Sequence, residues 1–275
     1  MGAFEDIPGR LALLGAGRMG TAMLAGWLAA GLDPEKIVVL DPSPSARARE
    51  LIARHGIAHN PPPRLSDMAL LVVAVKPQMM DEALKPLAGA GGGGSLVISI
   101  AAGITLGSFA DVFGADVPVI RAMPNTPAAI GKGITALVGN GRVTDAQRGI
   151  AHTLLAPLGE VVEVENEALM DAVTATSGSG PAYVFLLAEC LAAAGEAQGL
   201  PPELAAKLAR ATVAGAGALL EQAAESPAAL RAAVTSPGGT TEAALRTLMA
   251  DDGLCDLMTR AVAAATRRSR ELAGA

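Results

Sequence analysis

The first half of the chain alternates short apolar runs with longer stretches of helical periodicity. The runs predict strands at residues 11–14, 37–40, 70–75, 96–100, 117–120, 133–138 and 160–164. The stretches between them predict helices at residues 19–30, 45–55, 78–87, 106–113 and 145–158. Strands that are apolar on both faces and separated by helices are typical of a mostly parallel sheet covered on both sides. We therefore expect an α/β fold here, with a doubly wound sheet.

The pattern changes near Glu165, after which no strand is predicted. Helices are expected at residues 168–176, 181–198, 202–224, 227–234 and from 241 to the end, with a break at Asp252-Gly253. We therefore predict two domains, a sheet domain at 1–165 and an all-α domain at 166–275. The last helix carries an apolar stripe at positions 254, 257, 258, 261, 262 and 265, the spacing of one helix face. The stripe fits either an intramolecular core or a contact with a second copy.

Composition narrows the function classes. Hydrophobic residues make up 51% of the 275 positions and charged residues 17%, which argues against intrinsic disorder. The net charge of −6 and the aromatic content of 2% argue against nucleic acid and anionic membrane surfaces as partners. The longest uncharged stretch, residues 86–110, is rich in glycine and fits a buried strand between loops, not a membrane helix.

The first ten residues and the two cysteines bear on the cellular compartment of the protein. Residues 1–10 have no basic start followed by an apolar run, so no secretory signal is expected. Cys190 and Cys255 lie in apolar helical sequence without a neighbouring CxxC pattern, and we predict that both are buried. We therefore expect a soluble, cytoplasmic protein.

A glycine motif supplies the first candidate site. Residues 15–20 read Gly15-Ala16-Gly17-Arg18-Met19-Gly20, directly after a predicted strand and at the start of a helix. In a Rossmann-type fold the first glycine permits a tight turn, the second lets a pyrophosphate approach, and the third lets helix and strand pack closely. Asp41 ends the next strand, where an acidic residue contacts ribose. The motif predicts a dinucleotide site, the alternative being a tight turn that binds nothing.

The choice of nicotinamide cofactor depends on the residues around Asp41. The carboxylate itself favours NAD(H), because it accepts hydrogen bonds from ribose hydroxyls. Ser43, Ser45 and Arg47, with Arg18 nearby, instead favour a 2′-phosphate. We expect NADP(H) to be preferred, with NAD(H) as the alternative.

Further candidate cofactor contacts follow three other strands. The loop Ala74-Val75-Lys76-Pro77 follows the third main strand, Ala102 and Gly103 follow the fourth, and Asn125 follows the fifth. Ligands of doubly wound sheets bind at the carboxyl ends of the strands, so these loops are expected beside the glycine motif.

Two polar clusters interrupt the helical half. Residues 177–183 begin with Ser177 and Gly178, and residues 235–241 include Ser236, Pro237, Gly238, Gly239, Thr240 and Thr241. Each cluster precedes a helix, whose free N–H groups can bind a small carboxylate. The plainer interpretation is ordinary helix capping. No metal site is expected, and His55, His59 and His152 all lie outside these clusters.

These motifs together resemble the Δ1-pyrroline-5-carboxylate reductase family. The resemblance covers nearly the whole chain and is carried by residues 15–20, 74–77, 101–103, 121–127, 177–183 and 234–241, the last two blocks being the most specific. It implies reduction of a cyclic imine to L-proline by NADPH or NADH, and an intertwined homodimer that in many members assembles into a decamer. Asp41 departs from the family pattern, because many members have a non-acidic residue there.

The resemblance also implies site roles. Residues 236–241 would hold the substrate carboxylate, with Ser177 and Gly178 alongside, and Thr241 would hydrogen-bond the ring nitrogen as the catalytic residue. Imine reduction agrees with the sequence, because a protonated imine needs no strong general acid. Thr241 is too weak an acid to be the final proton source, and we expect water to supply that proton.

Two other functions are considered. A β-hydroxyacid dehydrogenase would carry a Lys one turn before an Asn, and the helix after Gly180 has neither; short-chain dehydrogenases need Tyr-x-x-x-Lys, whereas Tyr183 is followed by Leu187. The second alternative is a non-enzymatic dinucleotide sensor, which does not need two helix N-termini suited to a small anion.

Overall fold

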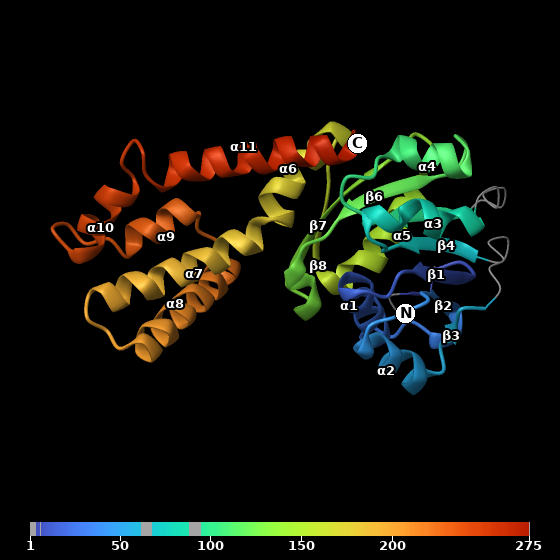
Figure 1. Cartoon of the computed structure of the whole chain (residues 1–275), viewed down its shortest axis with the longest axis horizontal. Coiled ribbons are helices and arrows are strands. Elements are labelled where there is room, and N and C mark those ends of the chain that lie inside the picture. Colours follow the sequence, from blue (N-terminus) through green and yellow to red (C-terminus); the bar gives the residue numbers. More distant parts are fainter. Residues whose placement is uncertain (1–3, 6, 62–67, 88–94, 275) are drawn as a thin grey trace. The chain divides into compact units, whose positions relative to one another are not determined.

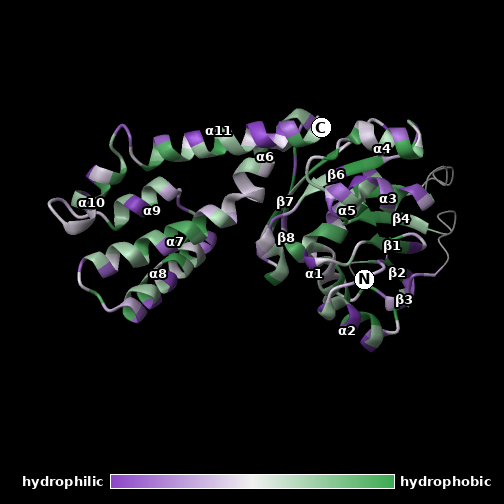
Figure 2. Cartoon of the chain, viewed as in Figure 1, coloured by the Kyte–Doolittle hydropathy of each residue, from purple (hydrophilic) through white to green (hydrophobic). Residues whose placement is uncertain are grey.

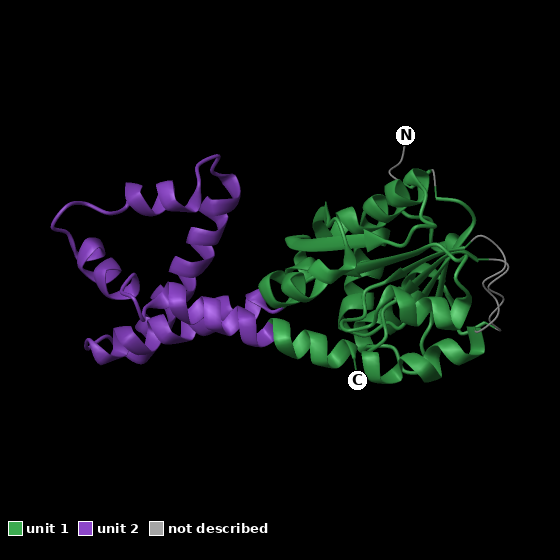
Figure 3. Cartoon of the chain, turned by 90° about the horizontal axis from the view of Figure 1, so that it is seen from above, with its two compact units in different colours: residues 1–178, 266–275 green, residues 179–265 purple. Residues whose placement is uncertain are grey.

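The computed structural model describes residues 4–5, 7–61, 68–87 and 95–274. The glycine-rich residues 89–94 therefore lie outside the described residues, and so do residues 1–3 and 6 of the predicted N-terminal segment. Within them, the structure divides into two compact units (Figure 3). Unit 1 contains residues 1–178 and 266–275, and unit 2 contains residues 179–265.

Unit 1 is built on one eight-stranded sheet. The strands are β1 Arg10–Leu14, β2 Ile37–Leu40, β3 Ala58–His59, β4 Met68–Val73, β5 Leu96–Ser99, β6 Val119–Met123, β7 Gly133–Gly139 and β8 Gly159–Glu163. Their order is β3-β2-β1-β4-β5-β6-β7-β8. β6 and β7 run antiparallel, and the other pairs of described neighbours run parallel. The expected α/β fold with a Rossmann-type, doubly wound, mostly parallel sheet is confirmed.

Alternation along the strands divides the core into two layers. Leu11, Leu13 and Val39 face one layer, with α1 Arg18–Ala29, α2 Ala46–His55 and α5 Asp145–Leu155. Ala12, Leu14 and Val38 face the other, with α3 Met80–Leu84 and α4 Leu106–Phe113. Both faces are therefore covered, which explains why the central strands β2, β4 and β5 are apolar along almost their whole length. Figure 1 shows these helices around the sheet, and Figure 2 shows β1, β4 and β6 mostly in the apolar colour.

The chain leaves the sheet through three short helical turns. A 3-10 turn, Glu167–Leu169, leads into α6 Met170–Val173 and then a π-helical turn, Thr174–Gly178. Unit 1 also includes the end of the last helix, α11 Leu254–Ala273. This division of the chain differs from the two predicted domains, because residues 166–178 and 266–275 pack with the sheet.

Unit 2 is entirely helical. It contains α7 Gly180–Ala197, α8 Pro202–Gln222, α9 Pro227–Ala233, α10 Thr240–Leu248 and the first part of α11. The predicted helices and the break near Gly253 are confirmed. α7 and α8 pack as a pair, yet within this fully described unit the buried hydrophobic residues are Ala205 and Ala209. A helical unit of this size therefore leaves many of its large apolar side chains exposed.

Three details differ from the sequence predictions. The strand expected at 117–120 runs instead over Val119–Met123, because Pro118 has no N–H to donate to the sheet. The short strand β3 was not expected from its two-residue pattern. The predicted burial of Cys190 and Cys255 is wrong: both are exposed and free, since among the described residues no element covers these positions on α7 and α11.

Candidate active site

The glycine motif forms a tight turn between β1 and α1. Gly15 has φ +94°, and a side chain there would meet the carbonyl oxygen of Ala74 at 2.8 Å. A side chain at Gly20 would collide with the carbonyl oxygen of Gly15. These two glycines therefore permit the turn and the close approach of helix and strand, as their spacing predicts.

Gly17 differs from its two neighbours in the motif. It is exposed, and a side chain added there would meet nothing within 4 Å. It is the N-cap of α1, without a side-chain cap and without an acidic residue in the first turn. The first N–H groups of α1 therefore lie beside an open space, which fits a dinucleotide pyrophosphate.

Asp41 holds the neighbouring loop against this turn. Its Oδ2 accepts from the N–H of Ala16 at 2.6 Å, and its Oδ1 accepts from the N–H of Ser43 at 2.7 Å. On the other side, its backbone contacts Asn60, whose Nδ2 donates to the Asp41 carbonyl at 2.9 Å, and His59, whose Nε2 lies 2.9 Å from the same oxygen. The carboxylate thus fixes the β2–α2 loop, and the contacts from His59 and Asn60 were not evident from the sequence.

Of the hydroxyl and arginine residues after Asp41, Ser45 and Arg47 already have partners within the protein, whereas Ser43 is exposed. Ser45 caps α2 through the Ala48 N–H at 3.0 Å and lies 2.9 Å from the hydroxyl of Thr21. Arg47 pairs on the surface with Glu50 at 2.8 Å, and its hydrogen bond and charge lower the pKa of that carboxyl, with Arg54 contributing. Ser43 is exposed and remains suited to a ligand phosphate.

The predicted cofactor loops lie together at the carboxyl ends of the parallel strands. The N–H of Gly15 donates to Leu40 at 2.9 Å, and that of Ala74 donates to Leu14 at 2.7 Å. The next strand continues the pattern, since the N–H of Ile100 donates to Val73 at 3.0 Å. These bonds bring together the ends of β1, β2, β4 and β5, and with them the predicted residues Val75, Lys76, Pro77, Ala102 and Gly103.

Asn125 links this end of the sheet to Ser177. Its Nδ2 donates to the Ser177 carbonyl at 3.1 Å, and its Oδ1 accepts from the N–H of Ile134 at 3.1 Å. The contact places Ser177, from the polar cluster at the end of the π-helical turn, beside the carboxyl end of β6. Gly178 is adjacent, where a side chain would meet the end of Met123 at 2.6 Å.

A half-buried ion pair supports the same region. Arg121 is 5% exposed in its side chain and donates to Glu167 at 2.9 Å. The same Glu167 oxygen accepts from the N–H of Leu106 at the start of α4, at 2.8 Å. The 3-10 turn before α6 is thus fastened to β6 and α4, a relationship across 46 and 61 positions that sequence spacing does not show.

The second polar cluster lies in unit 2. Gly238 has φ +72°, and the N–H of Gly239 donates to Ser236 at 3.0 Å, closing a turn before α10. Gly239 is the N-cap of α10 without a side-chain cap, so the first N–H groups of the helix, from Thr240 and Thr241, have no intrahelical acceptor. Thr241 is half-buried at this helix start. The turn has the backbone geometry expected of a small carboxylate site.

Family models match both halves of the chain. Residues 167–272 match the model for pyrroline-5-carboxylate reductase dimerisation, and residues 10–103 match that for NADP oxidoreductase, coenzyme F420-dependent. The pyrroline-5-carboxylate reductase of Pseudomonas aeruginosa is 40% identical, covering 96% of this chain and 97% of that protein. The chain belongs to the pyrroline-5-carboxylate reductase family. The enzyme is thus an oxidoreductase that reduces the C=N bond of Δ1-pyrroline-5-carboxylate to give L-proline.

Other relatives agree with this assignment. The Synechocystis pyrroline-5-carboxylate reductase is 43% identical, covering 96% of this chain and 98% of that protein. The solved Coxiella burnetii reductase has a TM-score of 0.87 at 34% identity, covering 96% of this chain and 98% of that one. The Plasmodium falciparum pyrroline carboxylate reductase, solved with NADP bound, has a TM-score of 0.81 at 27% identity, covering 97% and 98%. Full-length similarity of this kind favours the reductase over the two alternative functions.

Neither a metal nor a membrane enters this assignment. Within the described ranges, no group of three or more His, Cys, Asp or Glu residues is arranged to hold a metal ion. Among the helices that the structure describes, none is long and apolar enough to cross a membrane.

Proposed function

We propose that the turn at 236–241 binds the substrate carboxylate and that Thr241 orients the ring nitrogen. The observation that carries this proposal is the start of α10, where the N-cap Gly239 offers no side-chain cap and the N–H groups of Thr240 and Thr241 have no intrahelical acceptor beside the Thr241 hydroxyl. Ser177 and Gly178, in unit 1, are the other residues for which we propose substrate contacts, and Asn125 holds Ser177 beside the predicted cofactor loops. The residues Ser236, Pro237 and Thr240 shape the turn.

In this proposal the cofactor and the protein groups have separate roles in the reaction. A bound reduced nicotinamide supplies the hydride to the imine carbon. Thr241 donates a hydrogen bond at the ring nitrogen and so fixes the orientation of the ring, while the α10 N–H groups hold the carboxylate. Because a threonine hydroxyl is a weak acid, we propose that water delivers the proton that the product amine needs.

Steady-state kinetics of Thr241→Ala test the role of this turn. We expect kcat/KM for the imine to fall ~5- to 150-fold, the effect of removing one partner from a buried hydrogen bond. Thr241→Ser should restore most of the activity, because it keeps the hydroxyl. Thr247→Ala, further along α10, is the matched control and should leave kcat/KM unchanged. Wild-type kinetics in Thr241→Ala would overturn the assignment.

We propose NADP(H) as the preferred cofactor, with NAD(H) used less well. The support is the exposed Ser43 hydroxyl beside the start of α2, the NADP bound to the Plasmodium relative, and the NADP oxidoreductase model matched by residues 10–103. Arg18, exposed at the first position of α1, is a second candidate for the 2′-phosphate. In this proposal Gly15, Ala16, Gly17, Met19 and Gly20 form the turn and helix start against which the pyrophosphate binds. Comparison of kcat/KM for NADPH and NADH decides the preference, and a higher value for NADH would contradict it.

We propose that unit 2 forms a homodimer, which in turn can assemble into a decamer. The support is the family model for dimerisation over 167–272 and the exposed apolar side chains of unit 2. These include Val184, Phe185, Leu186, Leu187 and Leu191 on α7, Leu204, Leu208, Leu219 and Leu220 on α8, and Leu254 and Leu257 on α11. A surface of this kind is typical of an obligate interface. Light scattering should give two or ten times the chain mass of 27.5 kDa, and a monomer would contradict the proposal.

We also propose a cytoplasmic location, supported by the two free cysteines, which are typical of a reducing compartment. Fractionation of the source cells with an antibody against the chain tests it, and recovery from an oxidising compartment would contradict it.

A further inference from the structure

Glu242 is held on the turn that precedes its own helix. Its Oε2 accepts from the N–H of Gly238 at 2.6 Å, four residues earlier in the chain. Glu242 is the third residue of α10 and is partly buried. An acid at this helix position usually bonds the N-cap N–H, but here the Gly239 N–H is already donated to Ser236 at 3.0 Å. The side chain therefore reaches one residue further, to the glycine with φ +72°.

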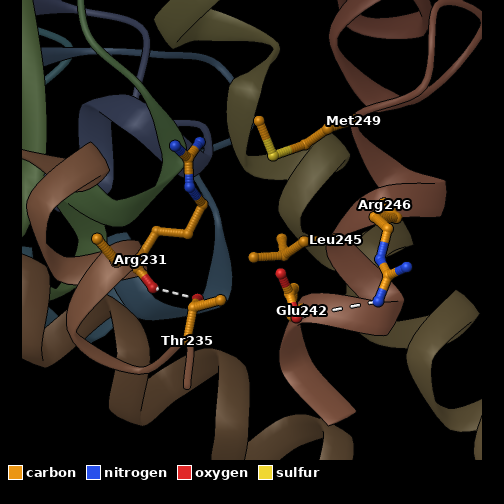
Figure 4. A pocket seen from close by; sticks show the side chains of 7 residues that line it. Arg231, Thr235, Glu242, Leu245, Arg246 and Met249 are labelled. Carbon is orange, nitrogen blue, oxygen red and sulfur yellow. Dashed lines mark hydrogen bonds and ion pairs between the residues drawn. The ribbon is translucent and has the colours of Figure 1, made fainter. Parts of the chain in front are cut away.

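The turn is fastened at its other end as well. The Thr235 hydroxyl donates to the Arg231 carbonyl at 2.7 Å, which joins the turn to α9. Figure 4 shows this bond and Glu242 around one hollow of about 550 Å³, lined also by Ala232, Leu245, Arg246 and Met249. The Arg246 contact to Glu242 is long, 3.9 Å, and largely exposed, so it contributes little to holding the carboxylate. The Gly238 N–H is therefore the close partner of Glu242.

This contact has a consequence for anion binding. With the Gly238 N–H donated to Glu242 and the Gly239 N–H donated to Ser236, neither group is available to a ligand. The N–H groups that remain at the helix start are those of Thr240, Thr241 and Glu242. The same contact joins Gly238, with φ +72°, to the first turn of the helix that carries these N–H groups.

We propose that Glu242 is a positioning residue for the substrate: its carboxylate holds the Gly238 N–H and thereby fixes the turn that binds the substrate carboxylate. The role depends on the acceptor oxygen and not on the negative charge. A charge so close to the substrate carboxylate would by itself weaken binding. The inference rests on the proposed function of residues 236–241.

Kinetics of Glu242→Ala and Glu242→Gln in the full chain test the inference. We expect Glu242→Ala to raise KM for pyrroline-5-carboxylate ~10-fold, because the turn loses the bond that orders it, with kcat within about twofold and KM for NADPH unchanged. Glu242→Gln keeps an acceptor oxygen for the Gly238 N–H and should return KM to the wild-type value or below it. Glu203→Ala removes an exposed acid from the first turn of α8 in the same unit, and it should change neither constant.

The outcomes separate the possible errors. Thr241→Ala, assayed in parallel, tests whether the turn binds substrate at all. If Thr241→Ala is impaired and Glu242→Ala has wild-type KM, the positioning role is wrong while the proposed function stands. Equal defects in Glu242→Ala and Glu242→Gln would show that charge matters instead of the hydrogen bond, and would overturn the inference. A Glu242→Ala defect shared by kcat and both KM values, with a lower melting temperature, would indicate a purely structural cap and would also overturn it.

Discussion

The side chain of Asn125 donates a hydrogen bond to the backbone carbonyl of Ser177, at 3.1 Å. The other end of the same amide accepts from the N–H of Ile134. One side chain thus joins the end of β6, the start of β7 and the π-helical turn. π-helical turns are rare and occur often at functional sites, because they displace backbone groups from the regular helix pattern. Here the displaced turn carries a proposed substrate residue, so Asn125 contributes to the site through Ser177.

Replacement of Asn125 by Ala should weaken both stability and substrate binding. Two backbone groups lose their partner, which costs ~1–3 kcal/mol of unfolding free energy for each group that stays unsatisfied. We expect KM for the imine to rise as the turn at Ser177 loosens. Urea unfolding and steady-state kinetics measure the two effects. The neighbouring exposed Thr126→Ala is the control, and an Asn125→Ala enzyme with unchanged stability would refute this account.

How much of this site can be predicted from the sequence depends on how far apart along the chain the interacting residues lie. The glycine turn was predictable because Gly15, Gly17 and Gly20 act within one strand–turn–helix segment, where spacing alone carries the geometry. The ion pair of Arg121 with Glu167 joins segments 46 residues apart, and nothing in a single sequence specifies which acid an arginine will meet. The burial predicted for Cys190 and Cys255 failed for a related reason. Apolar helical sequence predicts a buried face, but not whether the same chain or a second copy covers it.

Substitution of Gly17 should separate cofactor binding from folding. A side chain at this position meets no protein atom, so Gly17→Ala should unfold at the same or a slightly higher urea concentration. The added methyl group would occupy the space proposed for the pyrophosphate, so KM for NADPH should rise at least ~10-fold. Gly20→Ala is the contrasting variant, since its methyl group collides with Gly15 and should destabilise the fold itself. A Gly17→Ala enzyme with wild-type KM for NADPH would show that the cofactor does not approach here.

Asp41→Asn should shift cofactor preference toward NADPH. The substitution removes a negative charge from the loop proposed to accept the 2′-phosphate, and we expect the NADPH/NADH ratio of kcat/KM to rise ~10-fold. Asparagine keeps one acceptor oxygen where Asp41 has two, so one of the N–H groups of Ala16 and Ser43 loses its acceptor. A loss of ~1–3 kcal/mol of unfolding free energy is therefore expected. Asp33→Asn is the matched control, since Asp33 also accepts from a backbone N–H, that of Glu35 at 2.9 Å. If the ratio is unchanged in Asp41→Asn, Asp41 does not discriminate between the cofactors.

A buried hydroxyl near the end of α11 bonds to α6 within unit 1, and its removal should loosen that attachment. Ser269 is 6% exposed and donates to the Asp171 carboxylate at 2.6 Å, while Leu272 lies beside Gly103 of the predicted cofactor loop. Ser269→Ala leaves a carboxylate oxygen without its donor, and the Arg270 contact to the other oxygen, at 3.9 Å, is too long to replace it. We expect a loss of ~1–3 kcal/mol of unfolding free energy and faster amide exchange in α6. Thr259→Ala, whose hydroxyl bonds only within the exposed part of α11, should show neither effect. Unchanged exchange in α6 of Ser269→Ala would mean that apolar packing around Leu272, and not the hydroxyl, holds the end of the chain.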